Sequence, residues 1–90
     1  MAWTVEFHEA ARKELERLDR PVAKRITSFL RKRLAQRDDP RSIGEALKGS
    51  ELGDLWKYRV GDYRIIAAIE DQRLLILVVR IGNRREVYKR

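Results

Sequence analysis

The sequence predicts an α+β fold of the order β-α-α-β-β-β, with an N-terminal helical hairpin packed on one face of an antiparallel sheet. Apolar residues recur at helical spacing in the first half of the chain and alternate with a period of two in the second half. The dipeptide Gly61-Asp62, a two-residue hairpin signal, separates two of the alternating segments. We expect one domain spanning residues 1–90, because 90 residues are enough for one hydrophobic core and too few for two.

The first half of the chain predicts a strand followed by two helices. Residues 2–7 alternate and carry Trp, Val and Phe, which favour a short strand. Apolar residues then recur at i, i+4 and i+7 over residues 9–18, as on one face of a helix. Pro21 suits the first turn of a second helix, which we expect to continue to about residue 36. Two amphipathic helices joined by a tight turn predict an antiparallel helical hairpin.

The second half predicts a loop and then three successive strands. Several Gly and Pro residues within 37–54 break regular structure, with room for a short helical turn at 45–48. The strands that follow are expected at residues 55–60, 63–70 and 73–81.

Strand parity divides this sheet into two faces, because successive side chains of a strand point to opposite sides. The face expected to receive the helices is nearly all apolar and consists of Trp56, Tyr58, Val60, Tyr63, Ile65, Ala67, Ile69, Leu74, Ile76 and Val78. The opposite face consists of Leu55, Lys57, Arg59, Arg64, Ile66, Ala68, Leu75, Leu77, Val79 and Ile81. This second face is basic near the turn and apolar away from it. Its apolar part predicts either a protein partner or a cover formed by the tail or the long loop.

Several cations converge at the basic end of this face. A two-residue turn at Gly61-Asp62 sets Arg59 opposite Arg64, with Cβ atoms about 5 Å apart, where like charges destabilise a sheet. Lys57 lies two positions back on the same face. The residues that the last strand returns to this corner are Arg80, Arg84 and Arg85. The convergence favours an anion-binding site over a solvated edge with the arginines extended into water.

The composition narrows the chemistry. With 21 Lys and Arg against 14 Asp and Glu, the net charge of +7 favours binding to phosphate backbones or acidic proteins. The absence of Cys excludes disulfides, thiol nucleophiles and Cys-based zinc sites. His8 is the one histidine, so a ribonuclease mechanism with a His pair is excluded, and a helix-cap or surface role is expected for it. Since the carboxylates are scattered, we expect no metal and no other cofactor.

The N-terminus has no signal-peptide pattern, and the longest apolar stretch, residues 74–79, is far shorter than a membrane span. We therefore expect a cytoplasmic protein that does not interact with membranes.

The chain resembles the RelE/ParE superfamily of bacterial and archaeal toxins, in its RelE-like messenger RNA endonuclease branch. The matching segments are Leu47-Lys48-Gly49, residues 55–65 and residues 79–88. The resemblance implies the β-α-α-β-β-β fold and a toxin of a type II toxin–antitoxin system that cleaves messenger RNA in the ribosomal A site. The catalytic residues that it implies are Lys57, Arg59, Arg64, Arg84 and Tyr88. Arg59 departs from members with Lys at that position.

The resemblance implies a metal-free attack of the RNA 2′-hydroxyl on the neighbouring phosphate. Lys57, whose neutral form is favoured by the surrounding positive charges, would be the general base. Arg59 and Arg64 would bind the scissile phosphate and its growing charge. Arg84 would hold or protonate the leaving oxygen, and Tyr88 would stack on or orient a base.

Two further predictions depend on the same resemblance. Glu45 stands where certain relatives keep a catalytic carboxylate, although a loop or helix-cap role is the stronger interpretation of the sequence. The residues expected to contact messenger or ribosomal RNA are Lys24, Arg25, Arg31, Lys32, Arg80 and Arg85. For the residues of the second helix, a solvated helix face is an equally good interpretation.

Two other functions fit the same pattern. A ParE-like toxin would inhibit DNA gyrase without cutting RNA, and a non-enzymatic RNA-binding module would make similar phosphate contacts without a need for Lys57. Either kind of toxin should have an antitoxin partner, expected to cover the basic corner and the apolar residues Ile66, Leu75 and Leu77. Besides this antitoxin, the expected partners are the ribosome and messenger RNA, with no small-molecule substrate.

Overall fold

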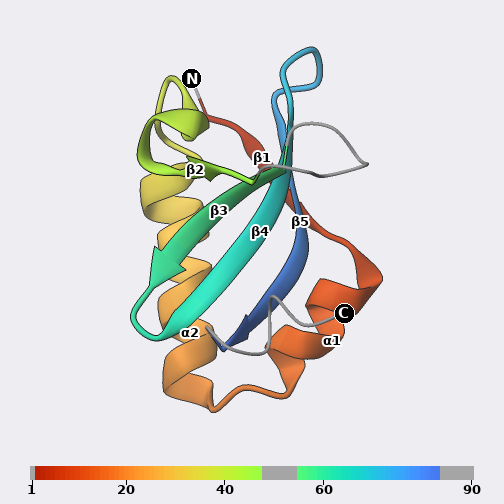
Figure 1. Ribbon diagram of the computed structural model, residues 1–90, viewed down its shortest axis with the longest axis vertical. Coiled ribbons are helices and arrows are strands. Elements are labelled where there is room, and N and C mark those ends of the chain that lie inside the picture. Colours follow the sequence, from red (N-terminus) through yellow and green to blue (C-terminus); the bar gives the residue numbers. More distant parts are fainter. Residues whose placement is uncertain (1, 48–54, 84–90) are drawn as a thin grey trace.

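The computed structural model describes residues 2–47 and 55–83 of the chain. The elements, in chain order, are β1 (Thr4–Phe7), α1 (Glu9–Glu16), α2 (Arg20–Ser28), the π-helical turn η1 (Phe29–Leu34), the 3₁₀ turn η2 (Pro40–Ile43), β2 (Glu45–Ala46), β3 (Leu55–Val60), β4 (Tyr63–Glu70) and β5 (Leu75–Asn83). This order confirms the α+β fold and adds the short strand β2. Figure 1 shows α2 behind β3 and β4, and α1 beside β5.

The five strands form one sheet in the order β1-β5-β4-β3-β2. The β3–β4–β5 meander is antiparallel as predicted, whereas β1 pairs with β5 in parallel. A parallel pair needs a crossover connection, and α1 and α2 lie in that connection between β1 and the rest of the sheet. The sheet is therefore mixed, with one parallel pair at its β1 edge.

The second helix continues into a wider turn. The helix was expected to reach about residue 36, and α2 followed directly by η1 covers nearly that length. In η1 the Ala35 amide donates to the carbonyl of Leu30, five residues earlier, at 2.9 Å. Such π turns are rare and change the direction in which the following side chains point. Ile26, Leu30 and Leu34 still form the buried stripe of this helix.

The helical turn predicted at 45–48 is wrong for its described residues. Glu45 and Ala46 form β2, which pairs with Lys57 and Trp56 of β3. The helical turn forms earlier, at η2, because the Asp39 side chain accepts a hydrogen bond from the Arg41 amide at 3.1 Å and caps it.

The core lies between α1, α2 and η1 on one side and the apolar face of the sheet on the other. Tyr58, Ile65, Ala67, Ile69, Ile76 and Val78 are all buried there, as the strand parity predicted. The Tyr58 hydroxyl donates to the Pro40 carbonyl at 2.9 Å, which ties η2 to this core.

A β-bulge in β5 corrects the predicted register of the last strand. Ile66 pairs with Arg80 while Ala67 pairs with Val78, so Val79 is left over between them. From this point the parity of β5 is inverted. Ile81, which was placed on the outer face, is 1% exposed in the core, and Arg80 turns to the outer face instead. Sequence alternation alone does not reveal a bulge within an apolar strand.

The apolar part of the outer face is already partly covered. Ile66 and Leu75 are buried, while Ala68 and Leu77 are half-buried. Both helices pack on the opposite, inner face of the sheet, so neither of them covers this patch. What covers the patch therefore stays a prediction. In the described part of the chain, no helix is both long and apolar enough to cross a membrane.

Candidate functional site

Three cations of the β3–β4 hairpin share the outer face of the sheet. The register pairs Arg59 with Arg64, and Lys57 with Ile66, two residue pairs further from the turn. This confirms the predicted opposition of the two arginines. The turn itself is tight, with Gly61 at φ 59°, a backbone conformation that glycine adopts without strain.

Arg64 is the most unusual of these side chains because it is only 8% exposed. Its Nη1 donates to the carbonyl oxygens of Tyr63 at 3.2 Å and of Gly61 at 3.5 Å. Among the described residues no carboxylate pairs with it, and its partner across the hairpin is another cation. A buried guanidinium that faces a like charge is costly to the fold, and an anion bound at this point would offset that cost.

Lys57 has a carboxylate opposite it. Glu45 of β2 pairs with Lys57 in the register, and its Oε1 lies 3.9 Å from the Lys57 Nζ. The loop or helix-cap interpretation of Glu45 is therefore wrong, since the residue sits in a strand at the basic end of the sheet. The Glu45 side chain is 80% exposed, which makes it accessible to a ligand lying across this face.

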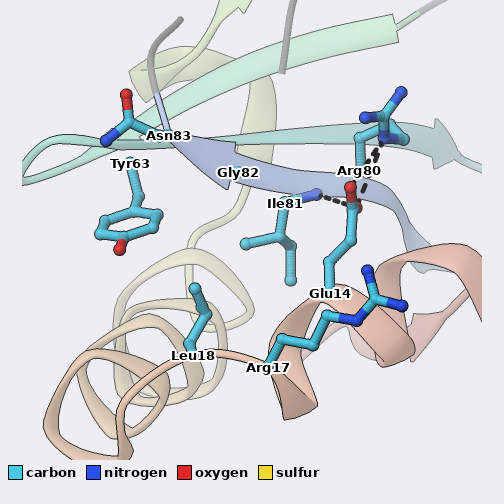
Figure 2. Close-up of a pocket in the computed structure, with 8 residues that line it drawn as sticks. All are labelled: Glu14, Arg17, Leu18, Tyr63, Arg80, Ile81, Gly82 and Asn83. Carbon is cyan, nitrogen blue, oxygen red and sulfur yellow. Dashed lines mark hydrogen bonds and ion pairs between the residues drawn. The ribbon is translucent and has the colours of Figure 1, made fainter. Parts of the chain in front are cut away.

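Arg80 reaches the outer face through the bulge but is held at the edge of β5. Its Nε donates to both oxygens of Glu14 of α1, at 3.3 and 3.2 Å. Glu14 also accepts the Ile81 backbone N–H at 2.8 Å, where β1 no longer pairs with β5 (Figure 2). Glu14 thus satisfies an edge amide and holds the Arg80 guanidinium against α1.

The predicted RNA-binding cations of the second helix separate into two groups. Lys24, Arg25, Arg31 and Lys32 are all exposed, but only Arg25 and Lys32 line a pocket between α2, η1 and the end of β3. The predicted site residues Arg84, Arg85 and Tyr88 lie outside the described residues.

The remaining candidates have structural roles. His8 caps α1, because its Nδ1 accepts a hydrogen bond from the Ala10 amide at 3.2 Å, which confirms the expected cap. Over residues 2–47 and 55–83, no three His, Asp or Glu residues gather in a group able to hold a metal ion.

Residues 5–88 match the model of the ParE toxin of type II toxin–antitoxin systems. The chain therefore belongs to this toxin family.

The individual relatives point toward the RelE branch. The chain is 28% identical to Toxin RelG of Mycobacterium tuberculosis over the whole length of both proteins. It is 30% identical to a putative RelE-like toxin protein of Escherichia coli, over 93% of this chain and 85% of that protein. In structure it resembles the toxin–antitoxin complex RelBE2 of M. tuberculosis, with a TM-score of 0.82 and 26% identity, over 96% of this chain and 95% of that one.

Sequence reasoning underrated two residues of this region. Glu45 carries no local signal, because only the β2–β3 register brings it to Lys57. Arg33 was not among the predicted RNA contacts, yet the widened turn η1 places it on the same pocket as Arg25.

Proposed function

We propose that this toxin is a ribosome-dependent endoribonuclease that cleaves messenger RNA by attack of a 2′-hydroxyl on the adjacent phosphate. The observation that carries the proposal is Arg64: a buried cation, facing Arg59, with no carboxylate partner among the described residues. A fold keeps such a group at a cost in stability when it has an anion to bind. The scissile phosphate of RNA is an anion of the right kind.

Arg64 and Arg59 together supply planar donors to this phosphate. Guanidinium groups bind phosphate oxygens through paired hydrogen bonds, and their charge stabilises the extra negative charge of the pentavalent transition state. Arg64 is already ordered by its hydrogen bonds to the turn carbonyls, so its donors need little reorganisation during the reaction. Arg84 and Tyr88 complete the proposed site by holding the leaving oxygen and stacking on a base.

The proton acceptor lies in the Lys57–Glu45 pair. The Glu45 carboxylate has free lone pairs, so it takes up the 2′-hydroxyl proton directly or through Lys57. Lys57 could accept the proton by itself only if its amine were neutral, because an ammonium group has no lone pair. The pair thus supplies an acceptor without an imidazole.

The partners follow from the kind of toxin. The similar structure RelBE2 is a complex of a toxin with its antitoxin. We propose an antitoxin with acidic and amphipathic segments for this chain, which would cover the Lys57–Arg59–Arg64 face and neutralise its charge. The ribosome would present the codon and hold the RNA in a strained conformation, because a site without a strong acid–base pair gains most from positioning.

Expression in translating cells or extracts tests the proposal. The wild-type chain should produce new 5′ ends within translated messages, and Lys57→Ala, Arg64→Ala and Arg84→Ala should each remove most of them. Arg73→Ala is the matched control, since Arg73 is exposed at the far turn of the hairpin sheet and pairs with Glu70.

The matching family model is that of the ParE toxin. The alternative function, inhibition of DNA gyrase by a ParE-like toxin, predicts a different result in the same experiment. Growth arrest with DNA damage and without translation-dependent RNA ends would favour gyrase inhibition and contradict the nuclease proposal. Binding to RNA without any cleavage would indicate a regulatory RNA-binding module.

A further inference from the structure

A second cationic site lies next to the Lys57–Arg59–Arg64 face, at the end of β3. A pocket of about 390 Å³ separates α2 and η1 from the end of β3 and is lined by Arg25, Ser28, Phe29, Lys32, Arg33, Arg59, Val60 and Gly61. Four of these eight residues are cations and none is acidic. Figure 1 shows the β3–β4 turn beside α2, where this pocket lies.

The cations of the pocket are available to a ligand. Arg25, Lys32, Arg33 and Arg59 are all exposed, and no described carboxylate forms an ion pair with any of them. Four positive charges around one small cavity, with no carboxylate partner among the described residues, repel one another, and a bound anion relieves that repulsion.

Local geometry brings these side chains together. Gly61 allows Arg25 to approach the turn, because a Cβ built at Gly61 would lie only 2.9 Å from the Arg25 Nη1. On the other side, the Arg33 guanidinium lies 5.7 Å from the ring centroid of Phe29, within the range of a cation–π contact. Phe29 is itself anchored on the core ring of Tyr58, at 6.1 Å between centroids.

We propose that this pocket binds a phosphate and its adjoining nucleoside of the RNA strand, one or more positions away from the cleaved bond. The inference rests on the proposed RNA substrate. Arg59 belongs both to the pocket and to the Arg59–Arg64 pair, so one polyanion with regularly spaced charges can occupy both places. The volume lies in the range of about 300–1,000 Å³ that is typical of small-ligand sites, which suits one nucleotide rather than a helix of a partner.

The chemistry of the lining favours RNA over an acidic peptide. Guanidinium groups combined with an aromatic ring, here the half-buried Phe29, are typical of single-strand recognition, where phosphates bind to Arg and bases or sugars pack on the ring. The described lining offers four cationic side chains and one hydroxyl, which match the phosphate and the sugar of one nucleotide.

The test measures binding of a fluorescent, single-stranded 2′-O-methyl RNA, which lacks the free hydroxyl needed for cleavage. Arg25→Gln and Arg33→Gln should each weaken binding several-fold. Each should also reduce the slope of log K against log salt concentration by about 0.7, the value for one lost phosphate contact on a single strand. Arg33→Lys should keep the slope, because the charge remains.

Arg12→Gln is the matched control, an exposed arginine on α1 with the same change in net charge. Equal slopes for Arg12→Gln and the pocket variants would overturn the proposal. It would also be overturned if the pocket variants lost affinity for a polyglutamate peptide and kept their affinity for RNA.

The result is separate from the nuclease test. The wild-type chain could cut no message while Arg25→Gln and Arg33→Gln still reduce the salt slope. That outcome would refute the nuclease proposal and support RNA binding in the pocket. Cleavage by the wild-type protein, together with unchanged salt slopes in the two variants, would support the nuclease proposal and refute RNA binding in the pocket.

Discussion

Replacing Arg64 with Met should stabilise the fold while destroying the activity. The substitution removes a cation that is 8% exposed and faces Arg59, and it fills the space with an apolar chain of similar length. Relief of the like-charge pair is worth about 0.2–1 kcal/mol. Replacing buried ionic groups with apolar ones stabilises by about 1–4 kcal/mol in favourable cases.

The hydrogen bonds that Arg64→Met loses offset little of this gain. They are 3.2 and 3.5 Å long, and the Gly61 residue is exposed, so water replaces the donor there. We therefore expect a net gain of about 1 kcal/mol, which raises Tm by roughly 4–8 °C in a domain of this size. Loss of a preorganised donor to the transition state should lower the cleavage rate by about 10²–10³-fold.

Urea and thermal unfolding of both proteins measure the first effect, and cleavage of a translated message measures the second. Arg59→Met is the control, because Arg59 is exposed and its removal relieves only the repulsion, within about 0.5 kcal/mol. A less stable Arg64→Met protein would refute the reasoning and make Arg64 a structural residue. If Arg59→Met and Arg64→Met raised the free energy of unfolding equally, the burial of Arg64 could not be the cause of the gain.

Three other substitutions test contacts that hold the site in place. Tyr58→Phe leaves the Pro40 carbonyl without its donor and should lower the free energy of unfolding by about 1–3 kcal/mol. Because burial raises the pKa of Tyr58 to about 12, wild-type stability should also fall as the pH rises from about 10 toward 12, a loss that urea titrations of the variant should not show. The hydrogen bond from Arg41 holds the pKa of Asp71 below its ordinary range, so its contribution is present above about pH 4 and lost as the pH falls through the folded pKa. The Tm values of Asp71→Asn and wild type should differ at neutral pH and converge in acid, and a constant difference would contradict this. Glu14→Ala removes the acceptor of a β5 edge amide and should cost about 1–3 kcal/mol in urea unfolding, with part of the loss restored by Glu14→Gln.

The hairpin at the centre of the site was predictable because local signals determine it. The bounds of β3 and β4 match the predicted residues 55–60 and 63–70, and the Arg59–Arg64 pairing follows from the two-residue turn alone. Alternation fixes the face of each side chain, and the turn fixes the register.

Other features depend on contacts that no short segment encodes. The last strand runs from Leu75 to Asn83 rather than over 73–81, and its bulge moves Ile81 from the expected outer face into the core. Both arise from pairing with β4 on one side and with β1 and Glu14 on the other.

The neighbourhood of Lys57 shows the same limit. Glu45 is twelve positions away in the sequence and reaches Lys57 only because β2 adds to the edge of β3. The cationic pocket likewise needs the π turn η1, which widens the helix at a place where the sequence pattern continues without interruption.

The chemical nature of the RNA ends tests most directly whether the 2′-hydroxyl of the RNA is the nucleophile. Attack by the 2′-hydroxyl must leave a 2′,3′-cyclic phosphate or its 3′-phosphate product on the upstream fragment and a 5′-hydroxyl on the downstream one. We predict these ends on messages cut by the wild-type chain, in the presence of a chelator that spares the ribosomes, and their absence with Arg64→Met. Downstream fragments that carry a 5′-phosphate would contradict the account, because they require an external water as the nucleophile.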